Sequence, residues 1–292
     1  MTHYDQLHRF LFDHHDIRGE IVSLEQAYQD VLKQRAYPAP IRHLLGEFLA
    51  AASLLSSLLK FDGIMTLQAR GDGPLQTIMA ECTRNRNLRA IAQFDGNHEF
   101  TDDITLPQLI GSGHLAITID PAQGQRYQGL VPLEADTLAG CLEDYFRLSE
   151  QLPTRFWLSA DDQRSAGLLL QTLPTPQHQS REETLEVWEE LTTLAASITT
   201  EEQLTLSHET QLHRLFHQYA VRLFEPASLR FQCSCSRERT ANTLMSLGEA
   251  EVREILAEQG VVELECQYCG EQYRFDARDV TKLFQPDTPT LH

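Results

Sequence analysis

Two pairs of cysteines near the carboxyl end constrain this chain more than any other feature of its sequence. Four of its six cysteines lie within the last 62 residues, as one C-x-C pair and one C-x-x-C pair followed by glycine. Four thiolates are a usual ligand set for one tetrahedral Zn²⁺ ion. In a reducing compartment such a cluster is typical of a metal site rather than of a disulfide framework. The spacing therefore predicts one zinc ion per chain, bound by Cys233, Cys235, Cys266 and Cys269.

The spacing alone leaves the role of the zinc open. Four sulfur ligands leave no position for a water molecule, which argues against a catalytic zinc and favours a structural one. A thioredoxin-like role for the C-x-x-C pair has less support, because no βαβ pattern surrounds it. A structural zinc contributes on the order of 10–16 kcal/mol of apparent binding free energy. A whole domain is stable by only about 5–15 kcal/mol, so a tail of this size should unfold if oxidation removes the thiolates.

The charge balance of the chain narrows the classes of partner. Its formal net charge is −18, and acidic residues exceed basic ones in every part of the chain. This argues against a nucleic-acid-binding surface and against binding to an anionic membrane, since both need a basic face. Residues 1–5 do not resemble a signal peptide. The most apolar stretch, 44–59, is shorter than a membrane span, so we expect a buried helix and a soluble, cytoplasmic protein.

The pattern along the chain predicts an α+β fold in three parts. These are an N-terminal mixed α/β-sheet domain (1–178), a helical linker (179–230) and a small C-terminal zinc-binding domain (231–292). In the first part, strands with helices grouped around them favour the α+β class. We expect helices there at 23–33, 41–59 and 138–149, and strands at 63–69, 75–80, 89–94, 114–120, 126–132, 154–158 and 167–173.

Two prolines at 174–176 mark the start of the predicted linker. Apolar residues then follow at helical spacing, at Leu185, Trp188, Leu191, Ala195 and Ile198. The simpler interpretation is that this stripe packs on the first domain and is part of its core. The alternative is a metastable element that can detach.

The predicted zinc domain contains two short strands, 261–266 and 272–275, on either side of the C-x-x-C pair. A helix at 249–259 ends at Gly260, and Asp276 is expected to cap a final helix that reaches residue 284. Arginines close in sequence to the cysteines are either ordinary surface charges or a balance for the −2 charge of a four-thiolate site; they are Arg230, Arg237, Arg239 and Arg274.

Taken together, these motifs resemble the bacterial redox-regulated 33-kDa heat-shock chaperone family, whose members are holdases. The resemblance covers nearly the whole chain. Its most specific part is the pair of cysteine motifs, in the sequences CSCSRER (233–239) and CQYCG (266–270). In the first domain it rests on DQLHR (5–9), RGE (18–20), LKFDG (59–63), GDGP (71–74), RYQG (126–129), LEDYF (142–146) and SEQLPT (149–154).

This resemblance implies a chaperone rather than an enzyme. The reduced, zinc-bound form would be inactive, and hypochlorous acid, or peroxide with heat, would oxidise the cysteines to two disulfides and release zinc. The implied pairs are Cys233 with Cys235 and Cys266 with Cys269. The linker would then unfold and the protein would dimerise and hold unfolding client proteins without ATP.

We hypothesise that three apolar linker residues, which are core-like in the folded state, contact clients after activation; they are Leu185, Trp188 and Leu191. The competing hypotheses are a zinc-ribbon enzyme or RNA-associated protein with a purely structural zinc, and a thiol oxidoreductase.

Overall fold

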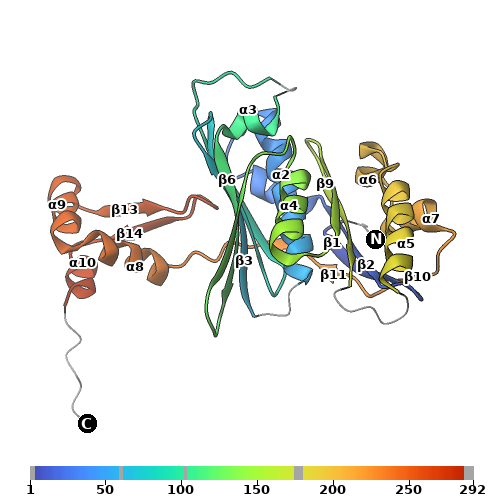
Figure 1. The fold of residues 1–292 in the computed structure, drawn as a ribbon. Helices are drawn as coiled ribbons and strands as arrows, with labels where there is room; N and C mark the ends of the chain where they lie inside the picture. Colours follow the sequence, from blue (N-terminus) through green and yellow to red (C-terminus); the bar gives the residue numbers. More distant parts are fainter. Residues whose placement is uncertain (1–3, 59–61, 102–103, 174–179, 286–292) are drawn as a thin grey trace, which may run out of the picture. The chain divides into compact units, whose positions relative to one another are not determined.

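The computed structural model of the chain describes residues 4–58, 62–101, 104–173 and 180–285 (Figure 1). The chain forms two compact units, residues 1–232 and 233–292. Helices and mostly antiparallel strands alternate irregularly in both, which confirms the predicted α+β class. The residues predicted as a linker belong to the first unit, and the proposed three-part division remains a prediction. The proline-containing boundary at 174–178 lies outside the described residues.

The first unit is built around two sheets. Its strands and helices are β1 (Gln6–Phe12), β2 (Ile17–Leu24), α1 (Gln26–Leu32), α2 (Ala39–Leu58), β3 (Gly63–Gly71), β4 (Leu75–Thr83), β5 (Asn87–Phe94), α3 (Leu106–Ile110), β6 (Gly113–Pro121), β7 (Tyr127–Pro132), α4 (Leu138–Tyr145), the π-helix η1 (Phe146–Glu150), β8 (Thr154–Ala160), β9 (Ser165–Thr172), α5 (Arg181–Ala195), α6 (Thr200–Thr205), α7 (His208–Phe216), β10 (Val221–Leu223), β11 (Ala227–Ser228) and β12 (Arg230–Phe231). The first sheet has the strand order β10-β1-β2-β9-β8, with β11 also paired to β1, and the second has the order β12-β5-β4-β3-β6-β7.

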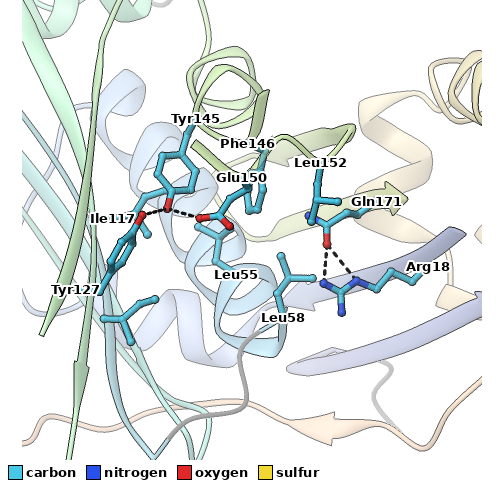
Figure 2. A pocket seen from close by; sticks show the side chains of 11 residues that line it. Arg18, Leu55, Leu58, Ile117, Tyr127, Tyr145, Phe146, Glu150, Leu152 and Gln171 are labelled. Carbon is cyan, nitrogen blue, oxygen red and sulfur yellow. Dashed lines mark hydrogen bonds between the residues drawn. The ribbon is translucent and has the colours of Figure 1, made fainter. Parts of the chain in front are cut away.

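Helix α2 fills the space between the two sheets (Figure 1). Its residues from Phe48 to Leu55 are almost completely buried, because one face packs on β4 and β5 and the other on β8 and β9. This confirms the prediction that the most apolar stretch of the chain is a buried helix. Within the described residues, none of the helices is long and apolar enough to cross a bilayer. A small cavity remains beside α2 at the seam between the sheets (Figure 2).

The helices predicted as a linker cover the opposite face of the first sheet. Alternate residues of a strand point to opposite faces. On β2, Val22 therefore packs toward α2, whereas Ile17 and Ile21 pack toward α5 and α7. A second, separate apolar cluster results, which is made by the sheet and the linker helices together; its buried members are Phe10, Phe12, Ile17, Ile21, Leu168, Leu170, Leu191, Ala195, Leu212, Leu215 and Phe216.

Several local elements differ from the sequence-based expectation. Strands β1 and β2 were not expected, and a helix was expected to begin at Ser23. That helix begins later, and Ser23 lies in β2. Its amino end is capped by the Asp5 carboxylate, which accepts hydrogen bonds from the backbone N–H groups of residues 25, 26 and 27. The expected helix at 138–149 is an α-helix to Tyr145 that continues as the π-helix η1.

The second unit is a small domain with a small core. It contains α8 (Arg237–Leu247), α9 (Glu249–Gln259), β13 (Val262–Glu265), β14 (Gln272–Phe275) and α10 (Ala277–Leu283). The two strands pair as an antiparallel hairpin. Helix α8 was not expected, whereas α9, the hairpin and the Asp276 cap of α10 were. Among the described residues of the unit, the buried core consists of Ala241, Leu244, Val252, Val262, Phe275 and Val280.

Candidate metal centre

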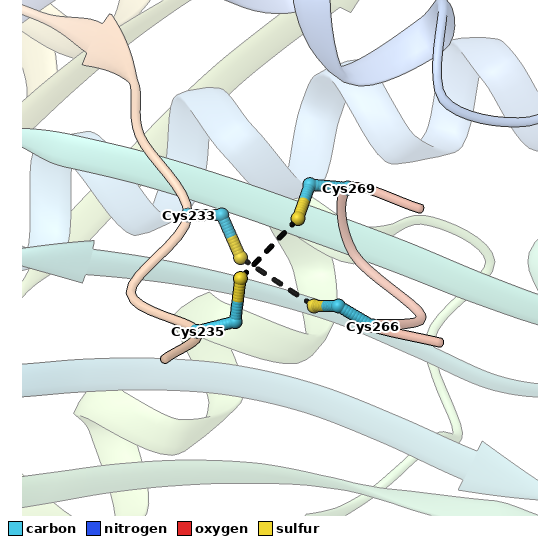
Figure 3. A group of neighbouring side chains, drawn as sticks. All are labelled: Cys233, Cys235, Cys266 and Cys269. Carbon is cyan, nitrogen blue, oxygen red and sulfur yellow. Dashed lines mark hydrogen bonds between the residues drawn. The ribbon is translucent and has the colours of Figure 1, made fainter. Parts of the chain in front are cut away.

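Two turns carry the four cysteines, and each turn is fixed by local structure (Figure 3). Cys233 and Cys235 lie in the irregular segment between β12 and α8. Ser236 caps this helix by accepting a hydrogen bond from the backbone N–H of Arg239 at 3.3 Å. Cys266 and Cys269 lie in the turn of the β13–β14 hairpin. There the backbone N–H of Gly270 donates to the Cys266 carbonyl at 2.8 Å, and that of Cys266 donates to the Glu271 carbonyl at 2.8 Å.

Gly270 makes the second turn possible. Its φ angle of +68° lies in the left-handed region, which L-residues with a Cβ rarely adopt. The glycine after the C-x-x-C pair therefore allows the backbone to turn at this point.

The four sulfur atoms converge on one small volume. All four Sγ atoms lie within 4.8 Å of one another. The Cys233 and Cys266 sulfurs are 3.6 Å apart, and the Cys235 and Cys269 sulfurs are 3.4 Å apart. A zinc–sulfur bond of about 2.3 Å in a tetrahedron requires sulfur–sulfur edges of about 3.8 Å. All four cysteines are free thiols, and the distances fit a shared metal ion.

The environment of the sulfurs also fits a bound cation. Burial, together with hydrogen bonds to the neighbouring cysteines, raises the pKa of the Cys269 thiol. A cysteine binds a metal as the thiolate. The surrounding protein groups favour the protonated form of Cys269, so a bound cation would be needed to keep this sulfur ionised. The Tyr273 hydroxyl on β14 donates a hydrogen bond to the Cys235 sulfur at 3.1 Å. Donors of this kind orient the ligands of a metal site. Sequence reasoning missed Tyr273, because its position opposite the C-x-C pair depends on the fold of the hairpin.

Each of the four nearby arginines contacts other groups of the protein. Arg237 pairs with Asp279 at 2.7 Å and lies over the Phe275 ring, and Arg274 pairs with Glu263 at 2.8 Å. Arg239 donates to the carbonyl and hydroxyl oxygens of Ser234, so it holds the C-x-C turn. Arg230 donates to the Asn87 side chain in the first unit. Three of these arginines therefore stabilise the local fold around the cysteines.

The remaining two cysteines lie far from this centre in sequence and belong to the first unit. Cys82 on β4 and Cys141 on α4 are completely buried in the main core of the first unit. Burial raises the pKa of both thiols. Because reactivity requires the thiolate, we expect both buried thiols to be unreactive.

The three candidate client-binding residues on α5 differ in environment. Leu191 is completely buried against the first sheet, and Trp188 is partly buried beside it. Leu185 is 43% exposed, so the expectation that it is core-like is wrong. The buried face of α5 instead passes through Thr184, Leu191 and Ala195. A short amphipathic sequence does not determine which residue at the edge of the stripe loses its contact.

Comparisons of the chain with protein families, with known proteins and with solved structures all point to the same family. The family described as Hsp33 protein matches residues 5–276. A 33 kDa chaperonin of Ectopseudomonas mendocina (strain ymp) is 55% identical over 278 residues, which cover 94% of each chain. A 33 kDa chaperonin of Pseudomonas aeruginosa (strain LESB58) is 51% identical over 285 residues, 97% of this chain and 96% of the relative. The crystal structure of the Thermotoga maritima Hsp33 homologue has a TM-score of 0.80 at 23% identity, and the match covers 96% of this chain and 98% of that one.

Proposed function

Because the chain belongs to the Hsp33 family of non-enzymatic chaperones, we propose that it is a redox-regulated, ATP-independent holdase. In this proposal the reduced protein binds one Zn²⁺ through its four C-terminal cysteines and does not hold clients. Oxidation releases the zinc, and the tail and then the linker unfold. The protein dimerises and holds unfolding proteins until conditions improve. The observation that carries the proposal is the convergence of four sulfurs in a unit with a very small core.

The metal supplies most of the stability of the second unit in this mechanism. Within the described part of that unit, six buried side chains form the core, and a segment this small rarely folds stably without a metal or disulfides. A bound zinc ion would be held by Cys233, Cys235, Cys266 and Cys269, with Tyr273 donating to one sulfur. When the zinc is bound it keeps the four sulfurs as thiolates, the form that oxidants attack. Loss of the metal therefore removes the main source of order in the tail.

With hypochlorous acid as the oxidant, the oxidation of the four cysteines can be written as a balanced reaction. Two thiolates, one molecule of hypochlorous acid and one proton give one disulfide, chloride and water, so two disulfides consume two molecules of oxidant. The proposed pairs are Cys233 with Cys235 and Cys266 with Cys269. In the folded domain the short sulfur–sulfur distances of 3.4 and 3.6 Å are between a cysteine of the C-x-C pair and a cysteine of the C-x-x-C pair. The two sulfurs of each proposed pair also lie within 4.8 Å of each other, so each pair must move closer together to form an S–S bond of about 2.05 Å as the metal leaves.

The linker helices cover the surface that clients would need. Helices α5 and α7 bury aromatic and aliphatic side chains of β1, β2 and β9 on the outer face of the first sheet. If these helices detach, that face and their own apolar stripe become accessible together. Trp188 and Leu191 would become exposed in this step, whereas Leu185 is already exposed in the folded state. We propose that this combined surface, with all three residues, holds clients.

The acidic composition supports the rest of the proposal. A net charge of −18 helps a chaperone with bound apolar clients to remain soluble, and it disfavours nucleic acids and anionic membranes as partners. We propose that the protein acts in the cytoplasm, where thiols stay reduced until oxidative stress occurs.

The decisive experiment follows zinc release and client holding in the same samples. The reduced, zinc-loaded protein is titrated with hypochlorous acid, and released zinc is measured together with light scattering from a thermally unfolding client. We expect one zinc per chain to be released as aggregation becomes suppressed, with peptide mapping giving the two local disulfides. A protein that releases zinc and still fails to suppress aggregation would refute the proposal. It would favour a static zinc ribbon in an enzyme or RNA-associated protein, which RNA binding at low salt would test directly.

A further inference from the structure

A cavity of about 140 Å³ lies in the first unit, at the seam between its two sheets (Figure 2). Its lining comes from β2, β6, β7, β9, α2 and the segment around η1. Cavities of about 150 Å³ in protein cores bind benzene-sized molecules. This cavity therefore has room for a hydrocarbon group of about five or six carbon atoms. The proposed chaperone mechanism does not use it.

The middle of the cavity is apolar. Aliphatic and aromatic side chains line it between its two polar ends, namely Leu55, Leu58, Ile117, Ile119, Phe146 and Leu152. A hydrocarbon group placed there would leave water and gain packing contacts. An apolar wall alone would not select one ligand, so the polar ends decide the chemical class.

Arg18 forms one polar end of the cavity. Its Nε and Nη2 atoms both donate to the Gln171 Oε1 atom, at 3.1 and 2.5 Å. Gln171 is buried and fixed, because its own amide nitrogen donates to the Thr154 hydroxyl at 2.8 Å. In the part of the chain that the structure describes, no acidic side chain forms an ion pair with Arg18. The guanidinium is thus partly removed from water with only a neutral acceptor, an arrangement that a ligand anion would improve.

The nearest acidic residue on the same strand face does not supply this anion. Glu20 lies two residues after Arg18 on β2 and is 2% exposed. Burial raises the pKa of Glu20 to about 8, so its carboxyl group is mostly protonated at neutral pH. Arginine remains charged at all relevant pH values. The positive charge at this end of the cavity is therefore not balanced by Glu20.

The opposite end of the cavity excludes a second anionic group. The Tyr127 and Tyr145 hydroxyl groups are 3.0 Å apart, and the Tyr145 hydroxyl donates to Glu150 Oε1 at 3.1 Å. Glu150 is exposed, and Tyr127 is 44% exposed, so this end meets solvent. A carboxylate near Glu150 would be repelled, whereas a hydrocarbon chain would contact the faces of the tyrosine rings.

We propose that this cavity is a binding site for a small aliphatic monocarboxylate, whose carboxylate pairs with Arg18 and whose chain fills the apolar middle. The planar fork of the guanidinium matches a carboxylate. One arginine beside the apolar middle of the cavity suits a single negative charge better than a phosphate. The inference does not rest on the holdase proposal, because it concerns the folded, reduced protein.

The test uses calorimetric titration of the full-length reduced, zinc-loaded protein with three probes of equal chain length. Hexanoate should bind with a stoichiometry of one per chain. Because a neutral hydroxyl cannot form the charged pair with the guanidinium, 1-hexanol should bind about tenfold or more weakly than hexanoate. Hexanedioate should also bind more weakly than hexanoate, since its second carboxylate approaches Glu150. Equal affinities for hexanoate and hexanol, or no binding of hexanoate, would overturn the proposal.

Three variants locate the site. Arg18→Met should weaken hexanoate binding about tenfold or more while changing hexanol binding little, a difference that general loss of structure would not produce. Leu58→Phe reduces the room in the cavity and should weaken both probes. Arg84→Met, at an arginine with a 63% exposed side chain, is the control and should change neither. Unchanged hexanoate binding by Arg18→Met, or by Leu58→Phe if the first variant does not fold, would refute the site.

Discussion

Leu191 on α5 offers a quantitative test of how the linker is held. Its side chain is completely buried between the linker helices and the first sheet. Truncating a buried leucine to alanine costs 2–5 kcal/mol, so Leu191→Ala should destabilise the docked linker by about 3 kcal/mol. Each 1.4 kcal/mol is a factor of ten, so the population of the detached linker should rise roughly a hundredfold.

The measurement is amide hydrogen exchange in the reduced, zinc-loaded protein, read on peptides from α5 and α7. We expect protection to fall in these helices and to stay unchanged in α2, which belongs to the other core cluster. Metal content should not change. If a detached linker is what permits client holding, Leu191→Ala should also suppress client aggregation at a lower oxidant dose than the wild type.

The chain supplies its own matched control. Leu185 is on the same helix, is 43% exposed and contributes little to the docked state, so Leu185→Ala should change stability by less than about 0.5 kcal/mol. The reasoning would be refuted if both variants increased exchange equally. It would also be refuted if Leu191→Ala left protection of α5 and α7 as it is in the wild type.

Three further predictions follow from single contacts. Tyr273→Phe removes the hydroxyl that donates to the Cys235 sulfur and should weaken zinc binding about 10- to 100-fold in a chelator competition, with the fold unchanged by circular dichroism. Because burial raises the pKa of Glu20 to about 8, stability should fall by about 2.5 kcal/mol between about pH 5.5 and about pH 7.5, and urea unfolding of Glu20→Gln should not show this loss. His8 on β1 lies with its Nδ1 atom 2.7 Å from that of His208 on α7, and burial lowers the pKa of His8. The unfolded state therefore takes up the proton first, so protection of α7 should fall as the pH drops below about 6.5, and His8→Gln should reduce that dependence.

Local sequence patterns were sufficient to predict those features that depend on interactions between residues close together in the chain. The two cysteine motifs, the glycine after the second and the Asp276 cap act over a few residues each, and the structure confirms the positions of the cap and the turn. The buried helix α2 was also predictable, because nearly all its residues are apolar or small. The identity of the bound metal and the disulfide pairs remain predictions.

Long-range contacts explain most of what sequence reasoning missed. Strand β2 carries Arg18 and Glu20 on the face that packs toward α2, so the expected alternation of apolar and polar residues is absent. Helix α1 receives its cap from Asp5, about twenty residues earlier, and not from Ser23. Neither feature has a local signal, since each depends on the pairing of β1 with β2.

The sequence by itself determined that four cysteines occur as two closely spaced pairs and that an amphipathic helical segment precedes them, because ligand spacing and helical periodicity are local properties. Only the tertiary structure decided that the sulfurs converge, that Tyr273 reaches one of them, and that Leu191 is buried whereas Leu185 is exposed. These facts depend on how separate elements pack, and packing joins residues that are far apart along the chain.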